Sequence, residues 1–325
     1  MRNGMTAVCL VSAMNAFSAT IEVPGDQTTI QAGIDAASEG DTVLVAPGTY
    51  TGDGNRDIDF GGTDLVLISE EGAEVTVIDC EGSENDFHRG FNFHMGESEA
   101  AVVGGFTIRG GYLGGNDYPE RSGGGVCCAP GSPTLKDCVI TDNSAKVGGG
   151  INCDFGASPR IDRCTISHNT SWSGRGGGLR CVSSSSPVLT DCTIASNSAD
   201  SHGGGIYCAN SRPYATAPVL INCLITDNSA SSAGGGFYGY GYGYWIGPPP
   251  ILINCIIANN SASRGGGFYL LDDCSPVLTN CIITKNSVDF PFRTGGGVSC
   301  VSSSPTLTNC TIAQNTAQDG GGIAC

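Results

Sequence analysis

The chain has 325 residues, of which 50 are glycine and only 14% are charged, and its formal net charge is −16. Glycine at this level destabilises helices, which excludes a coiled coil or a helical bundle. Glycine does not recur at every third position and proline is sparse, which excludes collagen. A surface this acidic repels phosphate backbones, so we expect no nucleic-acid partner.

The first 18 residues have the features of a secretory signal peptide. Arg2 is followed by an apolar stretch from Met5 to Phe17, and Ala16 and Ser18 are small residues at the −3 and −1 positions of a cleavage site. We therefore expect residues 1–18 to be a signal peptide. No run reaches the roughly 18 apolar residues that a membrane helix needs, so we expect no transmembrane segment.

Residues 19–60 predict a cap and a first strand. Thr28 and Gln31 have the spacing of a helix capping box, and apolar residues follow at helical spacing from Ile30 to Ala37. The next apolar run, at 42–45, reads as a strand. We expect the short helix near 28–38 to seal one end of a repeat structure, as terminal repeats must.

The segment from Asp53 to Asp86 is strongly acidic, with 11 acidic residues and one basic residue, Arg56. A solvated acidic edge explains this run, and a calcium site built from the carboxylate oxygens is the alternative. The four histidines have no second histidine or cysteine at metal-binding spacing. We therefore expect no cofactor and no other metal centre.

The rest of the chain is organised by a repeat. A triple glycine occurs eight times, beginning at Gly123, Gly148, Gly176, Gly203, Gly234, Gly265, Gly295 and Gly320. Seven of these are preceded by the pattern Cys-x-Ile-x-x-Asn, whose cysteines are spaced 26 to 32 residues apart. These cysteines are Cys138, Cys164, Cys192, Cys223, Cys255, Cys281 and Cys310.

Each repeat predicts three short strands, one after the glycines, one around Leu189 and its equivalents, and one at Cys-x-Ile. An Asp, Asn or Arg between the second and third strands marks a sharp bend, because Asp and Asn tolerate left-handed backbone. We therefore expect an all-β fold, a right-handed parallel β-helix over residues 61–325 with regular coils from about residue 102. The chain stops inside a repeat at Cys325, so we expect the solenoid to be cut short there.

These motifs resemble a known family. The stretch from Ile30 to Tyr50 resembles the N-terminal cap of the pectin-lyase-fold superfamily of right-handed parallel β-helices. Ile140 to Asn143 with Gly148 to Ile151, and the six later copies, resemble the polymorphic outer membrane protein repeat, with Ile in place of Phe and Gly in place of Ala. The resemblance implies a secreted or surface-attached protein, at the cell surface or outer membrane of a bacterium.

Alternation along the strands assigns 13 of the 17 cysteines to two buried columns. One column consists of the cysteines of the Cys-x-Ile pattern. The other lies in the first strand of each coil, where an apolar residue follows the glycines and the cysteine comes two positions later. Stacked coils are about 4.8 Å apart. A disulfide needs Cβ atoms about 3.8 Å apart. We therefore expect packed free thiols, with some cross-sheet disulfides as the alternative and a metal site as the least favoured reading.

The same alternation places one residue per coil on the outside of the first sheet, and three consecutive coils carry Tyr207, Tyr238 and Tyr269 there. The loop that leaves this sheet adds Tyr242, Tyr244 and Trp245, and these six aromatic residues form a predicted ligand-binding surface. Rows of aromatic rings suit stacking on sugars. The alternative is a tyrosine ladder that only stabilises the sheet.

Two functional classes follow. The favoured one is a non-catalytic secreted or surface protein that binds a polysaccharide or cell-surface glycan through its long side. The alternative is a polysaccharide-acting lyase or hydrolase, because the superfamily contains such enzymes and fold alone does not decide. Its candidate catalytic residues are Asp272, Asp273 and Arg180, which lie beside the same face without a recognised catalytic spacing.

Overall fold

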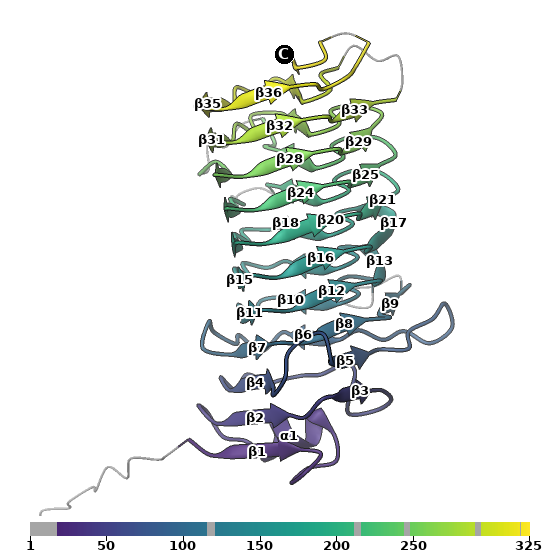
Figure 1. Ribbon diagram of the computed structural model, residues 1–325, viewed down its shortest axis with the longest axis vertical. Helices are drawn as coiled ribbons and strands as arrows, with labels where there is room; N and C mark the ends of the chain where they lie inside the picture. The colour runs from purple at the N-terminus through teal and green to yellow at the C-terminus, as the bar shows by residue number, and fades with distance from the viewer. Residues whose placement is uncertain (1–17, 116–120, 211–215, 244–247, 290–293, 319) are drawn as a thin grey trace, which may run out of the picture.

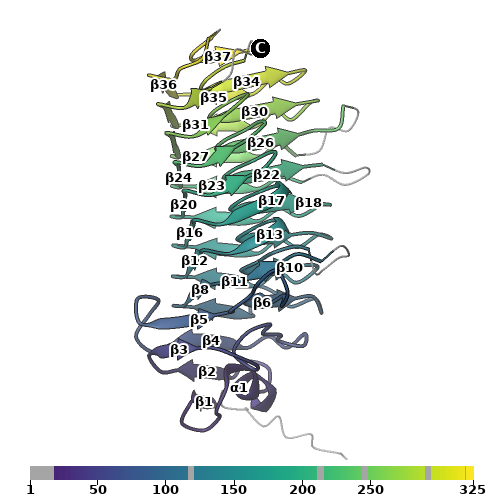
Figure 2. The same ribbon diagram turned by 90° about the vertical axis from the view of Figure 1, so that its right-hand side faces the viewer.

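The computed structural model describes residues 18–115, 121–210, 216–243, 248–289, 294–318 and 320–325. The chain winds into a solenoid whose successive coils stack along one axis, from β1 at one end to β36 and β37 at the other (Figures 1 and 2). One short helix accompanies four parallel sheets. The all-β parallel β-helix expected from the repeat is confirmed. No helix of the described residues has the length and apolarity to cross a bilayer.

Four sheets run along the solenoid, and each regular coil contributes one strand to each of them in the chain order C, A, B, D. Sheet A contains β1 (Thr20–Val23), β2 (Thr42–Val45), β4 (Val66–Ser69), β7 (Val102–Gly104), β11 (Thr134–Lys136), β15 (Arg160–Asp162), β19 (Val188–Thr190), β23 (Val219–Ile221), β27 (Ile251–Ile253), β31 (Val277–Thr279) and β35 (Thr306–Thr308). Sheet B contains β3 (Gly48–Tyr50), β5 (Thr76–Asp79), β8 (Thr107–Arg109), β12 (Val139–Thr141), β16 (Thr165–Ser167), β20 (Thr193–Ala195), β24 (Leu224–Thr226), β28 (Ile256–Ala258), β32 (Ile282–Thr284) and β36 (Thr311–Ala313).

The other two sheets flank the triple glycines. Sheet C, which follows them, contains β6 (Phe91–Phe93), β10 (Val126–Cys128), β14 (Ile151–Cys153), β18 (Leu179–Val182), β22 (Ile206–Ala209), β26 (Phe237–Tyr240), β30 (Phe268–Leu271), β34 (Val298–Val301) and β37 (Ile323–Ala324). Sheet D, which precedes them, contains β9 (Tyr112–Leu113), β13 (Ser144–Val147), β17 (Thr170–Arg175), β21 (Ser198–Ala199), β25 (Ser229–Ala230), β29 (Ser261–Ala262) and β33 (Ser287–Val288). The sequence predicts three strands per coil, and sheet D is the one it misses, because its strands are mostly two residues long.

Identical residues of the repeat stack in register. Ile194, Ile225, Ile257 and Ile283 are direct partners in neighbouring strands of sheet B, and all four are fully buried. The bend between sheets A and B has positive φ, 51° to 56°, at every predicted position. These positions are Asp137, Arg163, Asp191, Asn222, Asn254, Asn280 and Asn309. The bend between sheets B and D also uses left-handed residues, which the sequence does not reveal because they include His168, Ser196 and Lys285.

The asparagines of the repeat form a continuous ladder inside the bend between sheets B and D. Six consecutive amide pairs, from Asn143–Asn169 to Asn286–Asn315, have Nδ2 to Oδ1 distances of 2.9 to 3.1 Å. Each Oδ1 also accepts a hydrogen bond from the backbone N–H of the preceding asparagine, as Asn228 does from Asn197. The amide stack satisfies backbone groups that would otherwise be buried without partners.

The cysteines are packed thiols. All 16 cysteines of the described residues are free, so the alternative of cross-sheet disulfides is wrong for this part of the chain. In the A–B bend each sulfur donates to carbonyls, as Cys223 does to Leu189 and Ile221 at 3.6 and 3.3 Å. Hydrogen bonds to two carbonyls fix these thiols as structural groups.

The cap helix α1 (Ile30–Ala36) lies at the end of the solenoid that begins with β1 (Figure 1). Its N-cap is Thr29, whose hydroxyl accepts from the Ala32 N–H at 3.2 Å, so the assignment of the cap to Thr28 is wrong by one residue. Gln31 instead bridges to Asp59 of the next coil.

Candidate functional site

The tyrosine column forms as predicted on the outside of sheet C. Tyr207, Tyr238 and Tyr269 are direct strand partners, and their ring centroids are 5.2 and 5.8 Å apart with interplanar angles of 4° and 14°. They belong to a small apolar cluster that is separate from the solenoid interior. The column is nevertheless closed: each tyrosine is only 5–7% exposed. The expectation that its ring faces lie open to sugars is wrong, because each face packs on the next ring.

A second row of side chains covers the edge of this column. It consists of the residues that immediately precede the triple glycines. The Arg175 guanidinium lies 5.5 Å from the Tyr207 ring, the His202 ring lies 4.5 Å from the Tyr238 ring, and the Arg264 guanidinium lies 5.9 Å from the Tyr269 ring. The two guanidinium–ring contacts stabilise both partners, whereas the His202 contact is an edge-to-face contact between two rings. The neighbouring coil, rather than the strand itself, therefore determines how exposed the tyrosines are.

Burial and the neighbouring charges shift the pKa values of His202 and of Tyr238. Burial lowers the pKa of His202 to about 4, and the positive charges of Arg175 and Arg264 act in the same direction. His202 is therefore neutral at neutral pH. Burial raises the pKa of the Tyr238 hydroxyl, and the neighbouring tyrosines add to this rise. The Tyr238 hydroxyl thus remains protonated, able to donate as well as to accept a hydrogen bond.

A groove with a volume of about 560 Å³ runs beside this column. Five residues of the predicted site line it, from four consecutive coils of sheet C: Arg180, Tyr207, Tyr238, Tyr242 and Asp272. Arg175, Asn210 and Tyr240 complete its polar and aromatic walls. Tyr242 is 43% exposed and meets Tyr240 edge to face at 5.5 Å between centroids. The structure thus gathers most of the described part of the predicted site into one surface feature.

Arg180 has a partner that the sequence does not reveal. Its Nη1 donates to Asn152 at 2.7 Å and to Asp154 at 3.2 Å, and the carboxylate of Asp154 is largely buried. Asn152 is the outward residue of the preceding coil, and Asp154 lies two residues further along the same chain segment. Arg180 Nε is buried and has no hydrogen-bond partner among the described residues.

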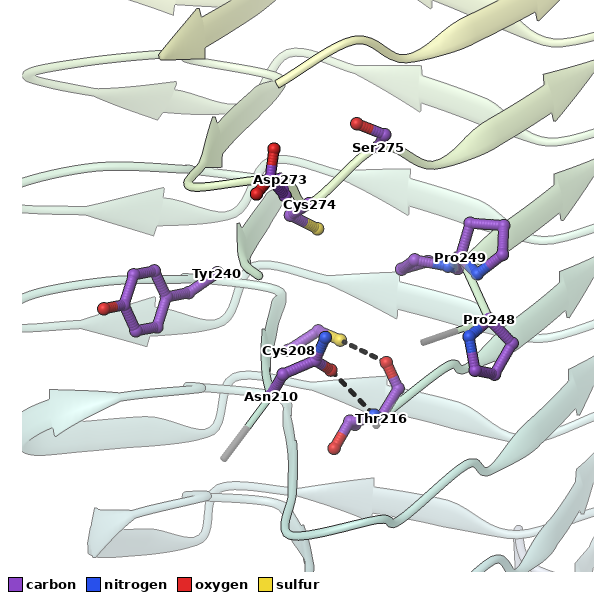
Figure 3. A pocket seen from close by; sticks show the side chains of 10 residues that line it. Cys208, Asn210, Thr216, Tyr240, Pro248, Pro249, Asp273, Cys274 and Ser275 are labelled. Carbon is purple, nitrogen blue, oxygen red and sulfur yellow. Dashed lines mark hydrogen bonds between the residues drawn. The ribbon is translucent and has the colours of Figure 1, made fainter. Parts of the chain in front are cut away.

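Asp272 and Asp273 form a left-handed turn after β30, with φ of 50° and 69°. They face different cavities: Asp272 lines the groove, whereas Asp273 lines a second cavity of about 350 Å³ at the start of the connections from sheet C to sheet A. Figure 3 shows this second cavity, with Cys208, Asn210, Cys274 and the prolines around it. Tyr240 and Asn210 line both cavities and separate them. Tyr244 and Trp245 of the predicted surface lie outside the described residues.

Some carboxylates of the acidic N-terminal coils lie against histidine or arginine side chains. Asp57 contacts His88 Nδ1 at 2.5 Å, and Asp59 contacts His94 Nε2 at 2.8 Å. No three acidic, histidine or cysteine side chains of the described residues come together in a way that could hold a metal ion. The calcium hypothesis for this segment therefore gains no support from the geometry.

Sequence comparison places the chain in a family. A family profile described as right-handed β-helix region matches residues 64–247 and 222–325, which is most of the chain. The chain belongs to the right-handed β-helix family. No curated protein sequence matches this β-helix chain.

Solved structures share the fold of this β-helix at low sequence identity. Pectate lyase Pel9A matches with a TM-score of 0.52 at 14% identity, over 95% of this chain and 82% of that chain. Pectin methylesterase PemA from Erwinia chrysanthemi matches with a TM-score of 0.47 at 12% identity, over 90% of this chain and 93% of that chain. At 14% identity the likeness to pectate lyase Pel9A is one of fold alone.

Proposed function

We propose that this β-helix is a secreted or cell-surface protein that binds an extended polysaccharide along the outer face of sheet C. The observation that carries the proposal is the groove, because it unites Arg180, Tyr207, Tyr238, Tyr242 and Asp272 across several coils. A linear glycan that runs parallel to the solenoid axis meets a new set of these side chains at each coil. The apolar N-terminal segment supports secretion, with a bacterial surface as the expected location.

The binding chemistry follows from which atoms remain accessible. The stacked rings offer edges and hydroxyl groups, while Tyr242 offers an exposed ring. Arg175 and Arg180 add positive charge to the groove in a chain whose net charge is −16. Such a local concentration of guanidinium groups favours sugars that carry carboxylates. We therefore expect uronate-containing oligosaccharides to bind more tightly than neutral ones, and less tightly at high salt.

We propose binding without cleavage. The Arg180 guanidinium is held by the buried Asp154, so it is poorly placed to accept a substrate proton. A glycosidase needs two carboxylates on either side of the scissile bond. Asp272 and Asp273 are instead adjacent residues of one turn that line separate cavities. The polysaccharide-acting lyase or hydrolase remains the alternative function.

A glycan array followed by calorimetry tests the proposal. The variant Arg175→Gln/Tyr242→Ala removes one charge and one exposed ring from the groove, and we expect it to weaken oligosaccharide binding by about tenfold, or about 1.4 kcal/mol. Arg160→Gln on the outside of sheet A is the matched control, because Arg160 is also exposed and only pairs with Asp162. If the parent binds no glycan, or the groove variant binds like the control, the proposal is wrong.

The same samples separate binding from catalysis. Reducing ends and unsaturated uronates are measured after long incubation of the bound oligosaccharides with the protein. We expect neither product to accumulate. Product that forms in the parent and is lost in Asp272→Asn or Arg180→Gln would replace the binding proposal with the enzyme alternative.

A further inference from the structure

The turn that follows β14 exposes an aromatic ring. Phe155 is 59% exposed, although its backbone is left-handed, with φ of 54°. A bulky side chain disfavours this conformation, because its Cβ atom comes too close to a carbonyl oxygen. Phe155 therefore places an apolar ring in solvent at a position where the backbone favours glycine, asparagine or aspartate. Neither burial nor backbone preference explains the residue.

Other coils carry small polar residues at the same turn position, two residues after the inner column of sheet C. They are Ser183, Asp272 and Ser302, and their φ values lie between 50° and 52°. Ser183 is the neighbour of Phe155 in the next coil, since the Gly156 N–H donates to the Ser183 carbonyl at 2.8 Å. Phe155 thus keeps the backbone of the repeat and departs from it only in the side chain. The reason for the phenylalanine must therefore lie in what its ring contacts.

The ring of Phe155 borders a hollow that adjoins the groove. This hollow has a volume of about 370 Å³ and is lined by Phe155, Gly156, Ser183 and Ser184. Ser183 also lines the groove, so the two features are continuous along the corner between sheets C and A. Arg180 lies in the coil between Phe155 and the tyrosine column. A polysaccharide that runs along the groove past Arg180 therefore meets Phe155 next.

One carboxylate holds both the turn of Phe155 and the nearest charge of the groove. Asp154 Oδ1 accepts from the Phe155 backbone N–H at 2.8 Å, and Asp154 Oδ2 accepts from Arg180 Nη1 at 3.2 Å. Asp154 itself is buried, with 7% of its surface exposed. The turn that carries the ring and the guanidinium group are therefore fixed relative to one another before a ligand arrives. Such preorganisation lowers the entropy that binding costs.

We propose that Phe155 is a stacking platform for one sugar ring of the bound polysaccharide, and that it extends the groove by one binding position toward the N-terminal coils. This inference rests on the proposed function. The exposed ring offers an apolar face to the C–H side of a sugar, while Arg180 is the nearest positive charge for the carboxylate of the adjoining residue. Backbone strain of this kind persists at binding sites, where the side chain that causes it is used.

Calorimetry with hexagalacturonate, as a representative uronate oligosaccharide, and thermal denaturation together test the platform. Phe155→Asn removes the ring and introduces a residue that tolerates left-handed backbone. We expect its affinity to fall by about tenfold and its unfolding midpoint to rise by about 2 °C. Phe155→Tyr keeps an aromatic ring and should bind like the parent. Met95→Asn is the matched control, because Met95 is 62% exposed after β6, another strand of sheet C, and does not line the groove.

Two results overturn this inference alone. The first is a Phe155→Asn variant that binds hexagalacturonate as tightly as the parent does, while the groove variant Arg175→Gln/Tyr242→Ala binds it more weakly. The second is a lowered unfolding midpoint in Phe155→Asn, which would make the ring a packing group of the fold. A parent that binds neither hexagalacturonate nor any glycan of the array instead overturns the proposed function, and this inference with it.

Discussion

The two cysteine columns of this solenoid are equally buried, but they differ in regularity. The column at the A–B bend runs without interruption through seven coils, and its thiols are fixed by carbonyl groups. The column of sheet C has Gly239 in β26 and Leu270 in β30 in place of cysteine, and the sulfur of Cys274, from the turn after β30, lies where a side chain at position 239 would lie. The interruption lies at the coils that also carry the groove and the second cavity.

This difference separates positions that build the fold from positions that build a site. A residue type that recurs in every coil has the same structural role in each, such as filling the interior or forming the hydrogen bonds of a bend. A residue that departs from the repeat must instead be explained by its own surroundings. The predictions below disturb first the regular columns and then the irregular region.

The largest effect is expected from a charge in the isoleucine column. Ile225 is fully buried between Ile194 and Ile257, so Ile225→Asp places a carboxylate in a dry interior without a partner. We expect no soluble, cooperatively folded protein. Expression and circular dichroism measure this, with Thr226→Asp on the outer side of the same strand as the control. A folded Ile225→Asp protein would overturn the assignment of this column to the interior.

The asparagine ladder should be the next most sensitive feature. Asn228 accepts from the Asn197 backbone and amide and donates to the Ile194 carbonyl and to Asn260. Asn228→Ala leaves several buried groups unpaired, and we expect it to lower the free energy of unfolding by about 3 kcal/mol. Asn254→Ala removes an amide from the exposed ladder at the A–B bend and leaves alanine at a φ of 55°, so it should cost only about 1 kcal/mol. Urea denaturation of both variants compares them, and equal losses would contradict the distinction.

Most of the fold could be predicted because every coil needs a buried interior and a sharp bend, and the same residue types therefore recur at these positions in each repeat. Asp137, Asn222 and their equivalents mark the left-handed bend in every coil, and the in-phase isoleucines mark the interior. The candidate site was harder to predict. Alternation along β26 correctly places Tyr238 on the outer side, but its exposure depends on His202, which belongs to a different coil. Asp154 likewise reaches Arg180 from the preceding coil, and no spacing in the sequence signals that contact.

A substitution at Gly239, where the cysteine column of sheet C is interrupted, is expected to have an effect of intermediate size on stability. Gly239→Ala inserts a methyl group where the Cys274 sulfur lies, and overpacking of this kind costs about 2 kcal/mol. Adding Cys274→Gly removes the sulfur and should recover part of the loss, so the two changes should not be additive. Thermal denaturation of both single variants and the double variant measures the coupling. Additive losses would show that the sulfur of Cys274 does not occupy the space beside Gly239.

The smallest expected effect concerns the pH dependence of stability near the tyrosine column. Because the pKa of His202 is lowered from 6.5 to about 4 in the folded protein, the unfolded chain binds a proton at pH values where the folded chain does not. The contribution of His202 is therefore complete above about pH 6.5 and is lost progressively as the pH falls toward about 4. His202 is only partly buried, so solvent screening reduces the expected loss to about 1 kcal/mol.

His202→Gln should remove this component while keeping a neutral side chain beside Tyr238. Other groups of the chain also bind protons in acid, so the quantity to measure is the difference between parent and variant in urea denaturation from pH 7 to pH 4.5. We expect the parent to lose stability faster than the variant over this range. Parallel curves would mean that His202 titrates like a solvated histidine and that Arg175 and Arg264 do not act on it. The tyrosine column would then be covered by packing alone, without the local positive field that we expect to attract acidic sugars to the groove.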